Sequence, residues 1–292
     1  MSAPVHPLVL VGGGRMGAAL LEGWLARGLS AGEAWVVEPD ATRRRVLGAR
    51  APGARIVAGV AEIPADLAPA ALVFAVKPQV LDGILPAWRP VAARSRFVLS
   101  IVAGKPVAAF TRALGAETVV VRTMPNTPAA VGAGMTVLYA PAGTPPEVRT
   151  AAAGLMRAVG EVAWIENEDA MHAVTAVSGS GPAYVFLLVE ALTEAGRRLG
   201  LDADLATTLA RHTVAGAGRL LLESGEDAAA LRRGVTSPGG TTEAALGVLR
   251  REGGLVDLLA EAVAAAARRS RELAGEEGNG RGREGDGEGA GT

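Results

Sequence analysis

Short apolar runs alternate with helical patterns through the first half of the chain. Residues 8–11 form the first run, and apolar residues at helical spacing follow it as far as residue 28. Uninterrupted apolar strands interleaved with helices are typical of a parallel-rich sheet that helices cover on both faces. The pattern therefore predicts an α/β fold. Its strands are expected at 8–11, 34–37, 55–57, 71–76, 97–102, 118–121, 134–139 and 162–165.

The second half of the chain is expected to be all-helical. Its helical segments are predicted at 169–177, 182–199, 204–223, 226–233 and 241–273. Residues 183–189 are apolar on every side, which predicts a helix that is buried all round. A small helical domain buries such a helix more easily against a second chain. We therefore expect a first domain over residues 1–165 and a helical dimerisation domain over residues 166–274.

Composition excludes several classes of protein. The 292 residues are 49% hydrophobic and carry a formal net charge of −1, with no basic stripe that would suit nucleic acid. Cysteine is absent, which rules out disulfides, thiolate nucleophiles and cysteine-based metal sites, and we expect no metal. No apolar run approaches the roughly 20 residues of a membrane span, and the N-terminus lacks a secretory signal, so we expect a cytoplasmic protein. Residues 275–292 are mostly glycine and charge, which predicts a disordered tail.

A glycine-rich turn follows the first predicted strand. Gly12, Gly14 and Gly17 fit the pattern G-x-G-x-x-G in the strand, turn and helix context that it requires. Glu38 ends the second predicted strand, about 20 residues beyond Gly17, where an acid can accept hydrogen bonds from an adenosine ribose. A purely structural glycine turn is the alternative. The combination favours a Rossmann-type dinucleotide site made of Gly12, Gly13, Gly14, Arg15, Met16, Gly17 and Glu38.

The choice between NADH and NADPH stays open. Glu38 would repel a 2′-phosphate, which favours NADH. Arg43, Arg44 and Arg45 follow closely and could bind that phosphate, although a solvated helix face accounts for at least one of them. We expect NADH to be accepted, with NADPH as the other candidate.

Polar residues at the carboxyl ends of later strands are further candidates, because ligands of such sheets bind there. Lys77 directly follows an apolar strand, where a cation could face a phosphate, a ribose or a substrate anion; a surface lysine is the alternative. Residues 124–128 hold two prolines around Asn126, which predicts a stiff loop that could present polar groups to a nicotinamide. Lys77, Pro78 and Asn126 are therefore expected to bind the cofactor.

Residues 235–242 form a polar, glycine-rich turn between two segments of helical composition. The stretch offers three threonine hydroxyls, one serine hydroxyl and the amides beside Gly239 and Gly240, but no titratable side chain. These groups can bind a small anion at a helix N-terminus, although a simple capping turn is the alternative. A second break, Ser178-Gly179-Ser180-Gly181-Pro182, ends one helix and starts another.

Taken together, these motifs resemble those of pyrroline-5-carboxylate reductases, the enzymes that make proline. The resemblance covers residues 8–273. The glycine turn at 12–17 is common to many dehydrogenases. The stretches 122–128, 176–184 and 235–242 are specific to the family when they occur together. The matching stretches are 12–17, 75–79, 122–128, 176–184 and 235–242.

The resemblance implies hydride transfer from NADPH or NADH to the C=N bond of 1-pyrroline-5-carboxylate, which gives L-proline. A protonated imine is already electrophilic, so it needs orientation and binding of its carboxylate more than a strong acid or base. In the family's pattern Thr242 bonds the ring nitrogen, and Ser237 is the second catalytic residue. The substrate-binding residues would be Ser178, Gly179, Ser180, Gly181, Gly239, Gly240 and Thr241, and Ala75 and Val76 would join the cofactor-binding set.

The resemblance also implies an assembly of identical chains. Family members form dimers through interlocked helical domains, and rings of dimers also occur, so one site could take residues from two chains. One departure is visible at Val60-Ala61-Glu62, where several relatives carry an asparagine that contacts the cofactor ribose. It weakens residue-level claims about the cofactor at that point and leaves the overall expectation in place.

Other functions fit parts of the same pattern. A hydroxyacid dehydrogenase would need a lysine on a helix of the second domain, but no lysine lies beyond Lys105. A catalytically inactive NAD(P)-binding sensor would need only the glycines of the first domain, and the intact turn at 235–242 argues against it. A reductase of a related cyclic imine with another ring size would use the same residues.

Overall fold

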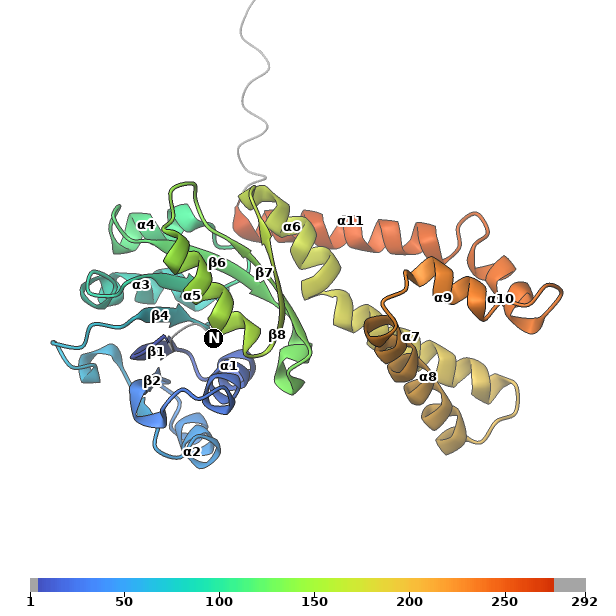
Figure 1. Cartoon of the computed structure of the whole chain (residues 1–292), viewed down its shortest axis with the longest axis horizontal. Helices are drawn as coiled ribbons and strands as arrows, with labels where there is room; N and C mark the ends of the chain where they lie inside the picture. Colours follow the sequence, from blue (N-terminus) through green and yellow to red (C-terminus); the bar gives the residue numbers. More distant parts are fainter. Residues whose placement is uncertain (1–4, 276–292) are drawn as a thin grey trace, which may run out of the picture. The chain divides into compact units, whose positions relative to one another are not determined.

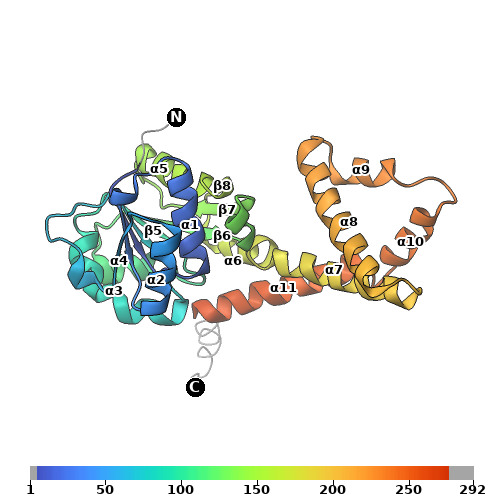
Figure 2. The ribbon, with the colours of Figure 1, turned by 90° about the horizontal axis from the view of Figure 1, so that it is seen from below.

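The computed structural model describes residues 5–275 and divides into two compact units. The first unit holds the chain up to Gly179 together with the stretch from Ala267 onward, and the second unit is Ser180–Ala266. Figures 1 and 2 show a sheet with its covering helices in the first unit and helices alone in the second. The predicted boundary at 165/166 stays a prediction. The predicted tail lies outside the described residues, apart from Gly275.

An eight-stranded sheet forms the frame of the first unit. Its strands are β1 (Leu8–Val11), β2 (Ala34–Val37), β3 (Arg55–Val57), β4 (Ala71–Phe74), β5 (Val98–Ser100), β6 (Val120–Pro125), β7 (Gly134–Tyr139) and β8 (Gly160–Ile165). They lie in the order β3-β2-β1-β4-β5-β6-β7-β8, and only the β6–β7 pair is antiparallel. The strand order reverses between β1 and β4, and sheets of this kind bind ligands at the carboxyl edge of that point.

Helices cover both faces of this sheet. They are α1 (Arg15–Ala26), α2 (Ala41–Arg50), α3 (Pro78–Ala92), α4 (Val107–Leu114) and α5 (Pro146–Arg157). Successive residues of a strand point to opposite faces. Leu8 and Leu10 therefore belong to the core under α1, α2 and α5, whereas Val9 and Val11 belong to the core under α3 and α4. The predicted α/β fold with a parallel-rich sheet is confirmed, and burial on both faces explains why its strands read as continuous apolar runs.

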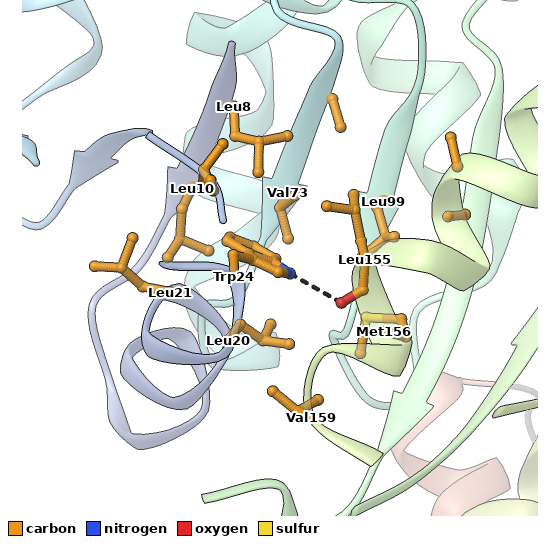
Figure 3. Packing of buried hydrophobic residues seen from close by; sticks show 14 of the residues in the cluster. Leu8, Leu10, Leu20, Leu21, Trp24, Val73, Leu99, Leu155, Met156 and Val159 are labelled. Atoms are coloured by element: carbon orange, nitrogen blue, oxygen red, sulfur yellow. Dashed lines mark hydrogen bonds between the residues drawn. The ribbon is translucent and has the colours of Figure 1, made fainter. Parts of the chain in front are cut away.

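Trp24 joins α1 to α5 inside the first of these cores. Its indole Nε1–H donates a hydrogen bond to the Leu155 carbonyl oxygen at 2.9 Å. Figure 3 shows the indole among the leucine, valine and methionine side chains of the same cluster. The bond gives the buried indole N–H its partner, and the Leu155 carbonyl oxygen also accepts the Ala158 N–H at 3.4 Å.

Two predicted boundaries differ from the structure. β6 runs on to Pro125, so Met124 and Pro125 belong to a strand rather than to a loop. Pairing with the antiparallel β7 accounts for the extension, since Met124 lies opposite Val137. The helix predicted over 241–273 is divided into α10 (Thr241–Leu249) and α11 (Leu255–Ala274) by turns over residues 250–254, in which Gly253 adopts a left-handed φ of 67°.

The second unit buries little of its apolar surface within one chain. After α6 (Met171–Val174) in the first unit, its helices are α7 (Gly181–Arg198), α8 (Ala203–Glu223), α9 (Ala228–Gly234), α10 and the first part of α11. No residue of α7 is buried in the described chain, and Phe186 and Leu187 are 60% and 62% exposed. These apolar side chains need another surface to cover them.

One helical stretch of the described chain, Glu168–Arg198, is long and apolar enough to cross a membrane. That finding rests on length and composition alone, and a single such helix is weak grounds for a membrane protein.

Candidate active site

The glycine turn between β1 and α1 is shaped for close approach of a ligand. Gly12 has a φ of 104°, which residues with a side chain rarely adopt, and a Cβ there would lie 2.6 Å from the Ala75 carbonyl oxygen. A Cβ at Gly17 would collide with the Gly12 carbonyl oxygen. At Gly14 no heavy atom lies within 4 Å of such a Cβ, so the first turn of α1 faces open space there. Open space beside helix N-terminal amides fits the pyrophosphate of a dinucleotide.

Glu38 at the end of β2 is 3% exposed, and its carboxylate is already bonded within the protein. Oε2 accepts the Gly13 N–H and Oε1 accepts the Asp40 N–H, each at 2.9 Å, and Arg43 Nε lies 3.1 Å from Oε1. The carboxylate therefore fastens the glycine turn to the start of α2, and its contact with a ribose stays a prediction. The Asp40 side chain caps α2 by accepting the Arg43 N–H, and this bond lowers the pKa of the Asp40 carboxyl from its usual 3.8.

The arginines after β2 make different contacts. Arg44 Nη1 donates to the carbonyl oxygens of Glu38 and Pro39 at 2.9 and 2.7 Å, which commits this side chain to the loop. The Arg43 side chain is 56% exposed and uses its Nε for Glu38, so its two terminal nitrogens face solvent. Arg45 is exposed, and its side chain makes no hydrogen bond or ion pair with the residues that the structure describes. Arg43 alone combines a fixed anchor with an exposed guanidinium.

The loop after β4 lies beside the glycine turn. The Ala75 N–H donates to the Val11 carbonyl oxygen at 2.8 Å, and Val76 packs close to Gly12. Lys77 is exposed at the N-cap position of α3, and Pro78 is the first residue of that helix. The structure thus brings Ala75 and Val76 to the predicted dinucleotide site, with Lys77 at the same edge of the sheet.

Asn126 follows β6 and contacts the helical turn that carries Ser178. Asn126 Nδ2 lies 3.4 Å from Ser178 Oγ, and Asn126 Oδ1 accepts the Met135 N–H of β7 at 2.9 Å. Met124 places its terminal methyl group where a side chain at Gly179 would lie. A residue predicted to bind the cofactor therefore lies beside two residues predicted to bind the substrate. The contributions of Met124 and the Met135 N–H were not predicted, because they arise from the pairing of β6 with β7.

Ser178 and Gly179 lie in a π-helical turn, Thr175–Gly179, at the end of the first unit. Such turns are rare and frequently occur at functional sites. Ser180 holds the N-cap position of α7 in the second unit, and Gly181 is the first residue of that helix. Ser180 keeps helical angles, with φ of −86° and ψ of −22°, so the predicted break is a change from π- to α-helical geometry within the helical stretch Glu168–Arg198.

The polar turn before α10 is built as a helix N-terminus within the second unit. The Gly240 N–H donates to the Ser237 carbonyl oxygen at 3.0 Å, and Gly239 has a φ of 68°, which favours glycine. Thr241 and Thr242 are the first two residues of α10, so their N–H groups have no partner within the helix. Hydroxyls and helix-end amides are thus gathered at one turn, as an anion-binding site requires.

The sequence pattern did not single out a carboxylate that lies at this same turn. Glu243 Oε2 accepts the Gly239 N–H at 2.7 Å. One of the amides expected to bind the substrate's carboxylate is therefore already bonded within the chain. The signal was an acid in the first turn of a predicted helix, a position from which a side chain can reach back to the preceding backbone.

The sheet, its glycine turn and the attached helical unit define a dinucleotide-dependent oxidoreductase. Within residues 5–275, no three His, Asp or Glu side chains gather so as to hold a metal ion. The pyrroline-5-carboxylate reductase of Pseudomonas aeruginosa is 40% identical over 279 residues, which cover 95% of this chain and 100% of that relative. The chain belongs to the pyrroline-5-carboxylate reductase family.

Family models and solved structures agree with this assignment. Residues 168–273 match the model described as pyrroline-5-carboxylate reductase dimerisation, and residues 7–104 match the model described as NADP oxidoreductase, coenzyme F420-dependent. The pyrroline-5-carboxylate reductase of Coxiella burnetii is 34% identical with a TM-score of 0.85, covering 92% of this chain and 98% of that one. The pyrroline carboxylate reductase of Plasmodium falciparum, solved with NADP bound, is 25% identical with a TM-score of 0.78, covering 94% and 100%.

Proposed function

We propose that the chain reduces the C=N bond of 1-pyrroline-5-carboxylate to give L-proline, with NADPH or NADH as the reductant. The contact between Asn126 and Ser178 carries the proposal, because it holds a predicted substrate residue at the carboxyl edge of the sheet, where the glycine turn also lies, within one unit. Relatives named for this reaction match the chain over nearly its whole length.

Residues of the first unit would hold the dinucleotide. The amides at the N-terminus of α1, beside Gly14, are placed to bind its pyrophosphate. When bound, the reduced nicotinamide supplies the hydride. The other residues proposed for this site are Gly12, Gly13, Arg15, Met16, Gly17, Glu38, Ala75, Val76, Lys77 and Pro78.

The substrate needs a hydrogen bond at its ring nitrogen and neutral donors for its carboxylate. We assign the ring nitrogen to the hydroxyl of Thr242, at the start of α10, and Ser237 to the same turn as a second catalytic hydroxyl. The carboxylate is assigned to hydroxyl and amide donors, which bind an anion without exchanging protons. The residues assigned to it are Ser178, Gly179, Ser180, Gly181 and Thr241. Gly239 and Gly240 would shape the turn, because their N–H groups already bond the Glu243 carboxylate and the Ser237 carbonyl oxygen.

Assembly into homodimers follows from the dimerisation match over residues 168–273. The exposed apolar residues of α7 would then be covered by a second copy of the chain, and this cover, rather than a bilayer, would account for the apolar stretch Glu168–Arg198. We further propose that the dimers assemble into rings and that the enzyme is cytoplasmic.

Thr242→Ala tests the assignment of the ring nitrogen. Losing a hydrogen bond to a charged group costs about 1.5–3 kcal/mol, so we expect kcat/KM for the imine to fall by about 10- to 100-fold. The dinucleotide affinity should change by less than about twofold, which is less than the loss of one hydrogen bond would cause. Thr242→Ser, which keeps the hydroxyl, should restore most of the activity.

Three outcomes would change the assignment. Unchanged kinetics in Thr242→Ala would remove this residue from the mechanism. Binding of both dinucleotides without oxidation of either one by the imine would favour the inactive sensor. Faster turnover of a cyclic imine with another ring size would move the assignment to that substrate.

A further inference from the structure

We infer that Asn126 is a positioning residue that aims the Ser178 hydroxyl at the carboxylate of the substrate. The inference rests on the proposed function, since it takes Ser178 to be a carboxylate donor. It departs from the expectation that Asn126 faces the nicotinamide. It is based on which group donates in each of two hydrogen bonds. One joins Met135 of β7 to Asn126, and the other joins Asn126 to Ser178.

The orientation of the Asn126 amide is fixed by its partner on β7. A backbone N–H can only donate, so the side-chain atom that lies 2.9 Å from the Met135 nitrogen must be the amide oxygen. The amide nitrogen is then the atom 3.4 Å from Ser178 Oγ, and it must be the donor of that contact. Ser178 therefore accepts a hydrogen bond from Asn126.

The Asn126 side chain does not make the capping hydrogen bond that its position favours. It is the N-cap residue of the 3-10 turn Thr127–Val131, where an asparagine side chain ordinarily accepts a hydrogen bond from the turn. Here the side chain makes no capping bond and reaches across to Met135 and Ser178 instead. The pairing of β6 with β7 extends to Pro125, the residue before Asn126, so the amide starts from a rigid edge of the sheet.

The Ser178 hydroxyl keeps its hydrogen for another acceptor. A serine hydroxyl has one hydrogen to donate and can accept through its lone pairs, and the Asn126 contact uses only an acceptor position. Among the described residues this contact is the one hydrogen bond of the Ser178 side chain. Thr175 in the same π-helical turn differs, because its hydroxyl donates to the Met171 carbonyl oxygen at 2.8 Å. The Ser178 O–H is thus the donor in this turn that is available to an anion.

Asn126→Asp is the most direct test of this link. The aspartate keeps an oxygen for the Met135 N–H, but its second oxygen can only accept and would draw the Ser178 O–H toward itself. We expect KM for pyrroline-5-carboxylate and the calorimetric Kd for the product L-proline to rise about tenfold, the change expected for one lost hydrogen bond to a charged group. The NADPH Kd and kcat at saturating imine should stay within about twofold of the wild type, because a change that small lies below the loss of one hydrogen bond.

Further variants separate positioning from charge. Asn126→Ala removes the donor without adding a charge and should raise KM in the same direction. Asn167→Asp adds the same charge at another residue of the first unit, whose side-chain oxygen accepts the Asp169 N–H at 2.9 Å, and should leave KM unchanged. In the background of Ser178→Ala, both Asn126 variants should have little further effect, since their route to the substrate is gone.

The inference is overturned if the Asn126 variants raise KM equally with and without the Ser178 hydroxyl. It is also overturned if they weaken NADPH binding and leave KM for the imine unchanged, which would return Asn126 to the nicotinamide. A wild-type protein that binds NADPH but oxidises none with the imine would contradict the proposed function itself, so the two failures are distinguishable.

Discussion

Glu38 and the arginines that follow it are the residues that we propose for the adenosine end of a dinucleotide. Both oxygens of Glu38 accept backbone N–H groups, and its side chain is 4% exposed. Arg44 is bonded to loop carbonyls, whereas Arg43 presents an exposed guanidinium that Glu38 anchors through Nε. Arg43 is therefore the residue best placed to meet a 2′-phosphate.

Arg43→Ala should weaken NADPH binding about tenfold and leave NADH binding nearly unchanged. Only NADPH carries the 2′-phosphate, and an exposed arginine–phosphate contact contributes on the order of 1.4 kcal/mol. The measurement is a fluorescence titration of each dinucleotide. Arg45→Ala removes a neighbouring exposed arginine and should change neither affinity by more than about twofold, a smaller change than the loss of a phosphate contact. Equal losses for NADH and NADPH in Arg43→Ala would show that its guanidinium does not recognise the 2′-phosphate.

The sequence could predict a site residue where its spacing from its neighbours along the chain was enough to indicate a role. Gly12, Gly14 and Gly17 are in that class, because their spacing after a strand reflects local backbone geometry. The partners of the side chains were not predictable. Glu38 bonds the amide of Gly13, 25 positions away, and Asn126 bonds Ser178, 52 positions away, so both contacts depend on how distant segments meet.

At the scale of elements, the packing of α1 against α5 depends on one polar contact inside an apolar core. The Trp24 indole N–H donates to the Leu155 carbonyl oxygen in the last turn of α5, which also accepts the longer bond from the Ala158 N–H (Figure 3). α1 begins directly after the glycine turn. Its fixed position therefore also fixes the amides proposed to bind the pyrophosphate.

Trp24→Phe should lower the free energy of unfolding by about 1–2 kcal/mol more than Trp88→Phe does. Both indoles are 3% exposed, but Trp88 packs edge-on against Phe74 at 5.9 Å and makes no hydrogen bond within the described residues. The difference is the loss of one buried hydrogen bond, after which the Leu155 carbonyl keeps only the longer bond from the Ala158 N–H. Urea denaturation followed by circular dichroism measures both variants. Equal losses would mean that the hydrogen bond contributes nothing beyond packing.

Element types were predictable because burial on both faces of the sheet leaves an unmistakable apolar pattern. Element ends were less so. The continuation of β6 through Met124 depends on pairing with β7, and the end of α10 depends on a turn at Gly253, in a stretch whose composition is otherwise helical. Nonlocal pairing and left-handed backbone geometry leave weak traces in a hydrophobicity pattern.

In the whole molecule, the second unit leaves many of its apolar side chains exposed in a single chain. α7 and α8 pair with one another, yet Phe186, Leu187 and Leu188 stay exposed in one chain. Contiguous apolar surface of this kind marks an interface, and the match over residues 168–273 identifies it as a dimerisation domain. The sequence predicted the apolar helix and the need for a second chain, but which residues touch the partner depends on the assembly.

Leu187→Asp should weaken dimerisation by about 100-fold or more, because the dimer would then bury an unpaired carboxylate. Multi-angle light scattering across a dilution series should show the variant as monomer at concentrations where the wild type is at least a dimer. Val131→Asp adds the same charge at a residue of the first unit that is 81% exposed, and it should leave the mass unchanged. A Leu187→Asp protein that keeps the wild-type mass would exclude this face of α7 from the interface.

We expect the chain to convert pyrroline-5-carboxylate into proline while it oxidises a nicotinamide dinucleotide. The most direct measurement quantifies both products in one reaction, L-proline by chiral chromatography and oxidised dinucleotide by the loss of NAD(P)H absorbance. We expect L-proline and oxidised dinucleotide to form in equal amounts, with no dinucleotide oxidised when the imine is omitted. Binding of NADH and NADPH without any proline formed from the imine would contradict the claim.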